Sequence, residues 1–185
     1  MGTRLSTIPL FSLLAAGSLA SVLVGIPSLH AAPIHGFGEL KFGMPPAEVE
    51  ALADCSSQTE CLYDLLGKNR YFVLGYGPVN DTADQPTGAT AYLSHIDIDM
   101  GAYTQEWFQE LFELFSSQYA MSHYPTEQED TSFRQSRSQE LVIGFADGLV
   151  LLKVVRRPFG NLIIRMVYQD DDHAQVQRKL WSVAP

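Results

Sequence analysis

The stretch Leu141–Arg157, LVIGFADGLVLLKVVRR, holds the clearest hairpin pattern in the chain. Two apolar runs flank Ala146–Gly148, whose Asp-Gly pair favours a tight type I′ turn. A second turn at Pro158–Asn161 leads into a third apolar run, Leu162–Tyr168. The C-terminal third of the chain therefore predicts a three-stranded antiparallel meander.

Two further strands are predicted upstream of this meander. Residues 70–76 are rich in strand-forming side chains, and residues 91–100 alternate between apolar and polar positions. The alternation predicts one buried face and one wet face. The expected buried face carries Ser94, Ile96, Ile98 and Met100, and the other carries Leu93, His95, Asp97 and Asp99.

Helices are expected before each group of strands. Pro45 and Pro46 suit a first helical turn, and Thr104 can cap a second helix that carries an aromatic stripe. That stripe comprises Phe108, Leu111, Phe112, Phe115 and Tyr119, widened by Trp107 and Leu114. A last amphipathic turn or short helix ends near Trp181. The order predicts an α+β fold of two successive helix-then-antiparallel-strands units, forming one sheet with the helices packed on one face.

The first 31 residues have the layout of an export signal. Arg4 is followed by 25 uncharged residues, 5–29, and small residues precede Pro33. We expect a cleaved signal peptide over 1–31 and a single α+β domain over 32–185. An uncleaved membrane anchor is the alternative, because the apolar segment approaches the length that spans a bilayer. After cleavage we expect no stable membrane insertion and a periplasmic or secreted location.

The charge balance of the chain is acidic, with 12 basic and 21 acidic residues and a net charge of −9. Removing the leader takes away only Arg4, which leaves 11 basic against 21 acidic residues, or about −10. Such a surface repels phosphate backbones, so we expect no nucleic-acid partner.

Cys55 and Cys61 are the two cysteines of the chain. An even pair at short separation in an exported protein predicts a disulfide. A redox role is the alternative, but the pair is not a C-x-x-C motif, and the neighbouring Asp54 and Glu60 would raise a thiol pKa. We therefore expect a structural bridge.

The segment Phe37–Val49, FGELKFGMPPAEV, resembles the start of small bacterial envelope proteins of the SmpA/OmlA/BamE type, in which a short strand precedes a Gly-Met turn and a helix. The residues that carry the likeness are Phe42, Gly43, Met44, Glu48 and Val49. The chain also looks like a broader set of uncharacterised exported proteins. Both resemblances imply a cell-envelope module for assembly or binding, and they imply no catalytic residue.

The sharpest chemical constellation is His95-x-Asp97-x-Asp99, which places an imidazole and two carboxylates on one strand face. Zinc or manganese would accept these ligand types, although a flat strand needs further ligands from elsewhere to surround an ion. The same pattern is also typical of the wet face of an antiparallel sheet. We expect no cofactor and assign no catalytic residue.

Three functional hypotheses follow. The first is a non-catalytic exported interaction module that presents a sheet face or edge to another envelope protein. The second is a small-ligand or metal-binding protein, or an enzyme, that uses His95, Asp97 and Asp99. The third is a secreted protein inhibitor, because the tandem layout looks similar to that of the β-lactamase-inhibitor type.

Overall fold

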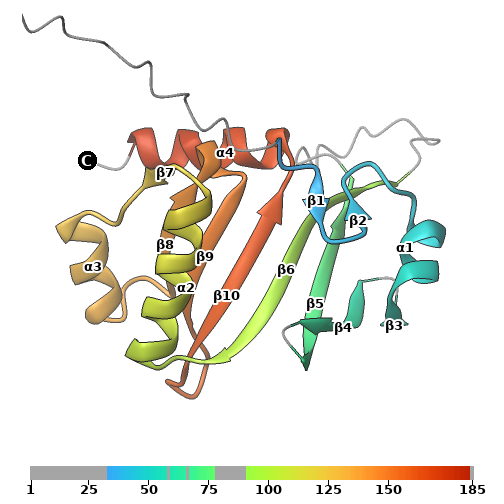
Figure 1. Ribbon diagram of the computed structural model, residues 1–185. Helices are drawn as coiled ribbons and strands as arrows, with labels where there is room; N and C mark the ends of the chain where they lie inside the picture. The colour runs from blue at the N-terminus through green and yellow to red at the C-terminus, as the bar shows by residue number, and fades with distance from the viewer. Residues whose placement is uncertain (1–32, 58, 66, 78–90, 184–185) are drawn as a thin grey trace, which may run out of the picture. The chain divides into compact units, whose positions relative to one another are not determined.

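The computed structural model describes residues 33–57, 59–65, 67–77 and 91–183, so the expected leader lies outside the described residues. The elements are shown in Figure 1. The strands are β1 (Gly36–Phe37), β2 (Leu40–Lys41), β3 (Asp54–Ser57), β4 (Glu60–Leu65), β5 (Lys68–Tyr76), β6 (Leu93–Ala102), β7 (Met121–His123), β8 (Glu140–Phe145), β9 (Val150–Arg156) and β10 (Leu162–Gln169). The helices are α1 (Pro46–Leu52), α2 (Gln105–Gln118), α3 (Glu127–Arg134) and α4 (Asp171–Val183).

Eight strands form one antiparallel sheet in the order β3-β4-β5-β6-β10-β9-β8-β7, and β1 and β2 form a separate pair. The α+β class and the C-terminal meander are confirmed. The division into two successive helix-then-strands units stays a prediction. The sheet order does consist of two four-stranded runs, joined where β6 pairs with β10.

The hydrophobic core lies on one face of this sheet, here called the inner face. Ile96, Ile98 and Met100 of β6 are at most 2% exposed on it, as the alternation predicted. The inner face is covered by α2, whose Phe115 ring lies 5.8 Å from that of Phe145 in β8. Figure 1 shows α2 in front of the sheet. Leu114 departs from the expected stripe, because it is 44% exposed.

The hairpin between β8 and β9 forms with a longer connection than the sequence predicts. Phe145 pairs with Val150, so four residues separate the strands instead of two. Ala146, Asp147 and Gly148 all have positive φ angles, of 49°, 55° and 85°. The Asp-Gly pair thus takes the expected left-handed conformation within a wider loop.

The Cys55–Cys61 disulfide forms, and it joins two paired strands. The two strands form a tight β3–β4 hairpin in which Cys55 and Cys61 are register partners. The bridge therefore fastens the edge strand β3 to its neighbour.

The final helix, α4, departs from the expectation that all helices pack on one face. Gly144 alternates with the inner-facing Phe145, so its missing side chain would point to the opposite, outer face. A Cβ atom at Gly144 would lie 2.2 Å from the Trp181 ring of α4. His95, also on the outer face, has its ring 5.2 Å from that of His173 in α4. Hence α4 packs against the outer face, where the glycine provides the space.

Within the described ranges, none of the helices combines the length and the apolar character needed to cross a bilayer.

The packing at Gly144 gives a direct test of the position of α4. Gly144→Ala should destabilise the protein by about 1–3 kcal/mol, because the new methyl group overlaps the Trp181 ring. Urea unfolding followed by circular dichroism measures this cost. Introduced into a Trp181→Ala background, the same substitution should cost less, since the overlapping ring is gone. Equal costs in the two backgrounds would contradict the packing.

Candidate functional site

The residues that resemble the envelope family lie at the junction of β2, α1 and β6. Gly43 has a φ angle of 90°, which favours glycine, and its N–H donates to the Leu93 carbonyl at 2.8 Å. The Leu93 N–H donates in turn to the Met44 carbonyl at 2.8 Å. Val49 of α1 is fully buried and Phe42 packs against the core, while Glu48 stands in the first turn of α1. The motif therefore fixes α1 to the start of β6.

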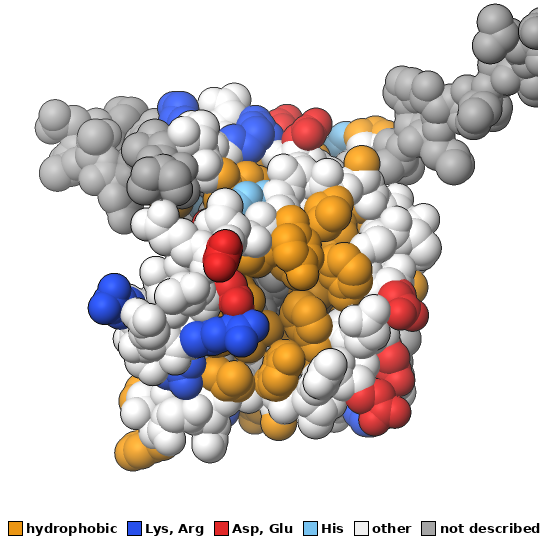
Figure 2. Space-filling view, turned by 90° about the vertical axis from the view of Figure 1, so that its left-hand side faces the viewer, with side chains coloured by type: hydrophobic (Ala, Val, Ile, Leu, Met, Phe, Trp, Pro, Cys, Tyr) orange, Lys and Arg blue, Asp and Glu red, His pale blue; other side chains and the backbone are white. Residues whose placement is uncertain are grey.

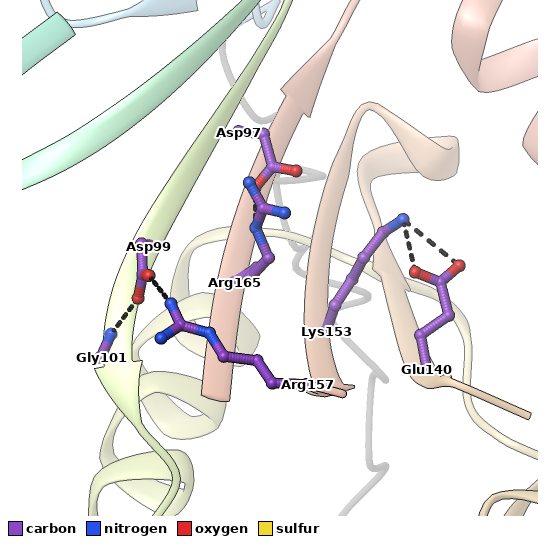
Figure 3. Close-up of polar contacts among 7 residues, drawn as sticks. All are labelled: Asp97, Asp99, Gly101, Glu140, Lys153, Arg157 and Arg165. Carbon is purple, nitrogen blue, oxygen red and sulfur yellow. Dashed lines mark hydrogen bonds and ion pairs between the residues drawn. The ribbon is translucent and has the colours of Figure 1, made fainter. Parts of the chain in front are cut away.

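The predicted wet face of β6 is observed for His95, Asp97 and Asp99, and its two carboxylates form ion pairs (Figure 3). The prediction was wrong for Leu93, which is fully buried in the core beside the register shift between Gly75 and Tyr76. Asp99 Oδ2 lies 2.7 Å from an Arg157 side-chain nitrogen, and Asp99 Oδ1 accepts from the Gly101 N–H at 2.8 Å. Asp97 Oδ1 lies 2.7 Å from Arg165 Nε, at an angle outside hydrogen-bond geometry. Each carboxylate thus contacts a different arginine.

These ion pairs extend across the outer face of the sheet. On the neighbouring strands, Lys153 Nζ lies 3.2 Å from Glu140 Oε2. Figure 3 shows the three pairs side by side, with Arg157 in the turn after β9 and the other five residues on β6, β10, β9 and β8. The carboxyl of Asp97 has a raised pKa, because its burial outweighs the attraction of Arg165 and Lys153. The ionised carboxylate of Asp97 therefore lowers the stability of the folded protein near neutral pH.

His95, the third member of the predicted constellation, lies with a different set of residues. Its ring covers Gly75, where a Cβ atom would come within 1.8 Å, and it faces His173 of α4. His173 Nδ1 lies 2.7 Å from Asp170 Oδ1, while the buried His95 Nδ1 has no hydrogen-bond partner among the described residues. His95, Asp97 and Asp99 share a face without converging. Across the described ranges, no group of three or more His, Cys, Asp and Glu side chains is placed to hold a metal ion.

A second feature, which the sequence does not reveal, is an open edge on β8. The short strand β7 pairs only with Gly144 and Phe145, so the rest of the β8 edge has no neighbouring strand within the described part of the chain. The Arg156 N–H donates to the Gln139 carbonyl on the β9 side. Because bonding alternates along an antiparallel strand, the backbone groups of Val142 point away from β9. Among the described residues, no strand pairs with Val142 on that side.

Two helices wall this open edge and make a groove of about 270 Å³. Trp181 of α4 forms part of one wall, with its ring stacked on His123 at 4.4 Å between centroids and 4° between planes. Figure 2 shows hydrophobic side chains gathered on the side of the molecule that carries α3 and β7. We call the groove between α3 and α4 the β8 edge groove. It is lined by Thr126, Gln128, Glu129, Ser132, Ser138, Glu140, Leu141, Val142, Gln177, Leu180 and Trp181.

A local sequence signal could have located one wall of the groove. The Thr126 hydroxyl accepts from the Glu129 N–H at 3.2 Å, and the Glu129 carboxylate accepts from the Thr126 N–H at 2.7 Å. This reciprocal pair is a capping box, recognisable as Thr-x-x-Glu after Pro125. The segment 118–137 is polar and predicts no helix by its hydrophobic pattern, so α3 was missed.

Comparisons with known proteins add no relative. The chain matches no protein-family profile, no curated protein and no solved structure. The likeness to SmpA/OmlA/BamE-type proteins therefore stays a prediction.

The environment of His95 predicts a pH dependence of stability. Its pKa is lowered, first by burial and then by His173, Lys153 and Arg165, and Asp170 opposes the shift. Between about pH 6.5 and the lower folded pKa, the unfolded chain binds more protons at this position than the folded protein. The stability contributed by neutral His95 is thus present above pH 6.5 and is lost as the pH falls.

His95→Gln should therefore reduce the loss of unfolding free energy between pH 7.5 and pH 5.5, measured by urea unfolding at both values. The exposed His35 gives a matched control, and His35→Gln should leave the loss as it is in the unchanged protein. Because Asp97 is present in all three proteins, its own titration cancels in the comparison. An unchanged loss in His95→Gln would contradict the assignment.

Proposed function

We propose that the protein is an exported, non-catalytic interaction module of the cell envelope that binds another protein at the β8 edge groove. The observation that carries the proposal is the open backbone of Val142 between α3 and α4. A free strand edge offers hydrogen bonds to an added extended segment, which is a recurrent mode of protein recognition.

The groove has the character of a docking surface. Leu180, on the α4 wall, is 62% exposed, and Met121 of the adjoining strand β7 is 51% exposed. An exposed apolar side chain in the wall of an unpaired edge, as Leu180 is, favours contact with a partner. The groove volume of about 270 Å³ lies just below the roughly 300–1,000 Å³ that is usual for small-molecule pockets. It suits a few side chains of an extended segment.

Two observations support the cellular context of the proposal. The leader pattern of residues 1–31 is typical of exported chains. The Cys55–Cys61 disulfide is compatible with an oxidising compartment such as the periplasm or the exterior. The two-unit organisation of the fold is supported separately by the sheet order, in which two four-stranded runs join where β6 pairs with β10.

Site-specific photocrosslinking in the native envelope tests the proposal. A photoreactive amino acid at Gln128 on α3 or Gln177 on α4 should give an adduct of one defined mass, because both positions line the groove. Denaturing electrophoresis and mass spectrometry of the purified adduct identify the partner.

A photoreactive group at Tyr71, which is 64% exposed on β5, provides the control. It should give no adduct of that mass, since β5 and β8 are separated by three strands in the sheet. Adducts at Tyr71 alone, or none at any of the three positions, would refute binding at the groove.

A second candidate function is that of a secreted protein inhibitor, which the same sheet order and Phe159 favour. This side chain is 94% exposed in the turn between β9 and β10, where it could insert into a protein cleft. On this alternative, a panel of secreted hydrolases that includes β-lactamases should contain one that the protein inhibits, with inhibition weakened by Phe159→Ala. Absence of inhibition across the panel would remove this candidate.

A further inference from the structure

We infer that the β8 edge groove selects an extended segment in which an apolar residue is flanked by basic residues. This inference rests on the proposed function, and it specifies the chemistry of the partner at that same site.

The apolar preference follows from the alternation of side chains along paired strands. A residue that pairs directly with Val142 places its side chain on the same face of the sheet as Val142. Val142 alternates with Leu141 and shares its face with Gly144, which contacts Trp181. The incoming side chain therefore meets the α4 wall, where Leu180 and Trp181 line the groove. An apolar residue at this position buries surface against both.

The basic preference follows from the charges of the lining. Among the described residues that line the groove, Glu129 of α3 and Glu140 of β8 are the two ionisable side chains, and none is a lysine or arginine. Thr126, Gln128, Ser132, Ser138 and Gln177 complete its polar part. A cationic side chain beside the apolar one can reach these carboxylates, whereas an acidic one is repelled. Glu140 already contacts a lysine, Lys153. Glu129 accepts from the Thr126 N–H and hydroxyl and lies 3.5 Å from His123 Nε2, so it contacts no lysine or arginine among the described residues and is the stronger determinant.

The length of the paired segment is limited by the neighbouring structure. Towards Gly144, β7 already occupies the edge. Towards Glu140, the hydroxyl of Ser138 donates to the Glu140 carbonyl at 2.7 Å and accepts from the Glu140 N–H at 3.3 Å. Val142 therefore offers the open pair of backbone groups, and affinity depends on the side chains next to it. This makes the site selective for sequence.

The inference is tested by selecting peptides from a random 12-residue display library on the immobilised mature protein. The enriched sequences should share an apolar residue with Lys or Arg beside it. A synthetic peptide of the strongest sequence is then measured by fluorescence anisotropy. Glu129→Gln should weaken binding about threefold to tenfold and reduce its salt dependence, because one carboxylate is lost. The exposed Glu127, in the first turn of the same helix but outside the groove lining, provides the matched control as Glu127→Gln.

Backbone pairing is tested on the peptide, so that the fold of the protein is untouched. N-methylation of the residue that pairs with Val142 should abolish binding, and methylation of the residues on either side should reduce it far less. On the protein, Leu180→Ser should weaken binding about tenfold. Because Leu180 is largely exposed, the substitution should leave the fold intact, so the weaker binding reports on the groove.

Three results would overturn the inference. The first is enrichment of acidic or wholly apolar peptides. The second is binding that is insensitive to N-methylation. The third is a dimer in analytical ultracentrifugation that Leu180→Ser dissociates, which would assign the groove to a second copy of the chain. If the Gln128 and Gln177 adducts form while the selected peptides are acidic, the proposed function stands and the inferred chemistry fails. If neither adducts nor selected peptides appear, both fail.

Discussion

The pairing of β6 with β10 is the constraint on which the rest of the structure depends. It joins the run β3–β6 to the run β7–β10 and aligns Ile98 with Met166. Because side chains alternate along a strand, a slip of one residue would turn Asp97 and Asp99 into the core. The burial of Ile96 and Ile98 in the hydrophobic core opposes that slip. The register is therefore set by the hydrophobic face, and the charged face follows from it.

The charged face shows how far this constraint reaches. Asp97 lies opposite Val167 in the ladder and contacts Arg165, the residue two positions away on β10. Such a partly buried pair loses solvation as well as gaining attraction, and the raised pKa of Asp97 indicates that the loss dominates there. The Asp97–Arg165 pair thus contributes little net stability. They keep the outer face polar while the opposite face carries the core.

The sequence was informative where a pattern repeats along one element. The alternation in β6 and the capped aromatic helix α2 were predicted because period and capping are local properties. The shared face of His95, Asp97 and Asp99 followed from the same alternation. Their separate partners could not be predicted in this way. Arg165 comes from β10, Arg157 from the turn before β10, and His173 from α4. The β8 edge groove was missed because its walls are two distant helices, and because β7 has only three residues.

The two edges of the sheet are protected by different means, and this difference underlies the proposal that one of them binds a partner. At β3, the Cys55–Cys61 bridge fastens the edge strand to β4. At the opposite edge, β7 is too short to cover β8, and α3 and α4 stand on either side of the gap. Open sheet edges are prone to unrestricted pairing with other strands. Helical walls leave room for a single extended segment and keep another sheet from approaching, so the proposed function assigns the gap at Val142 to selective binding instead of aggregation.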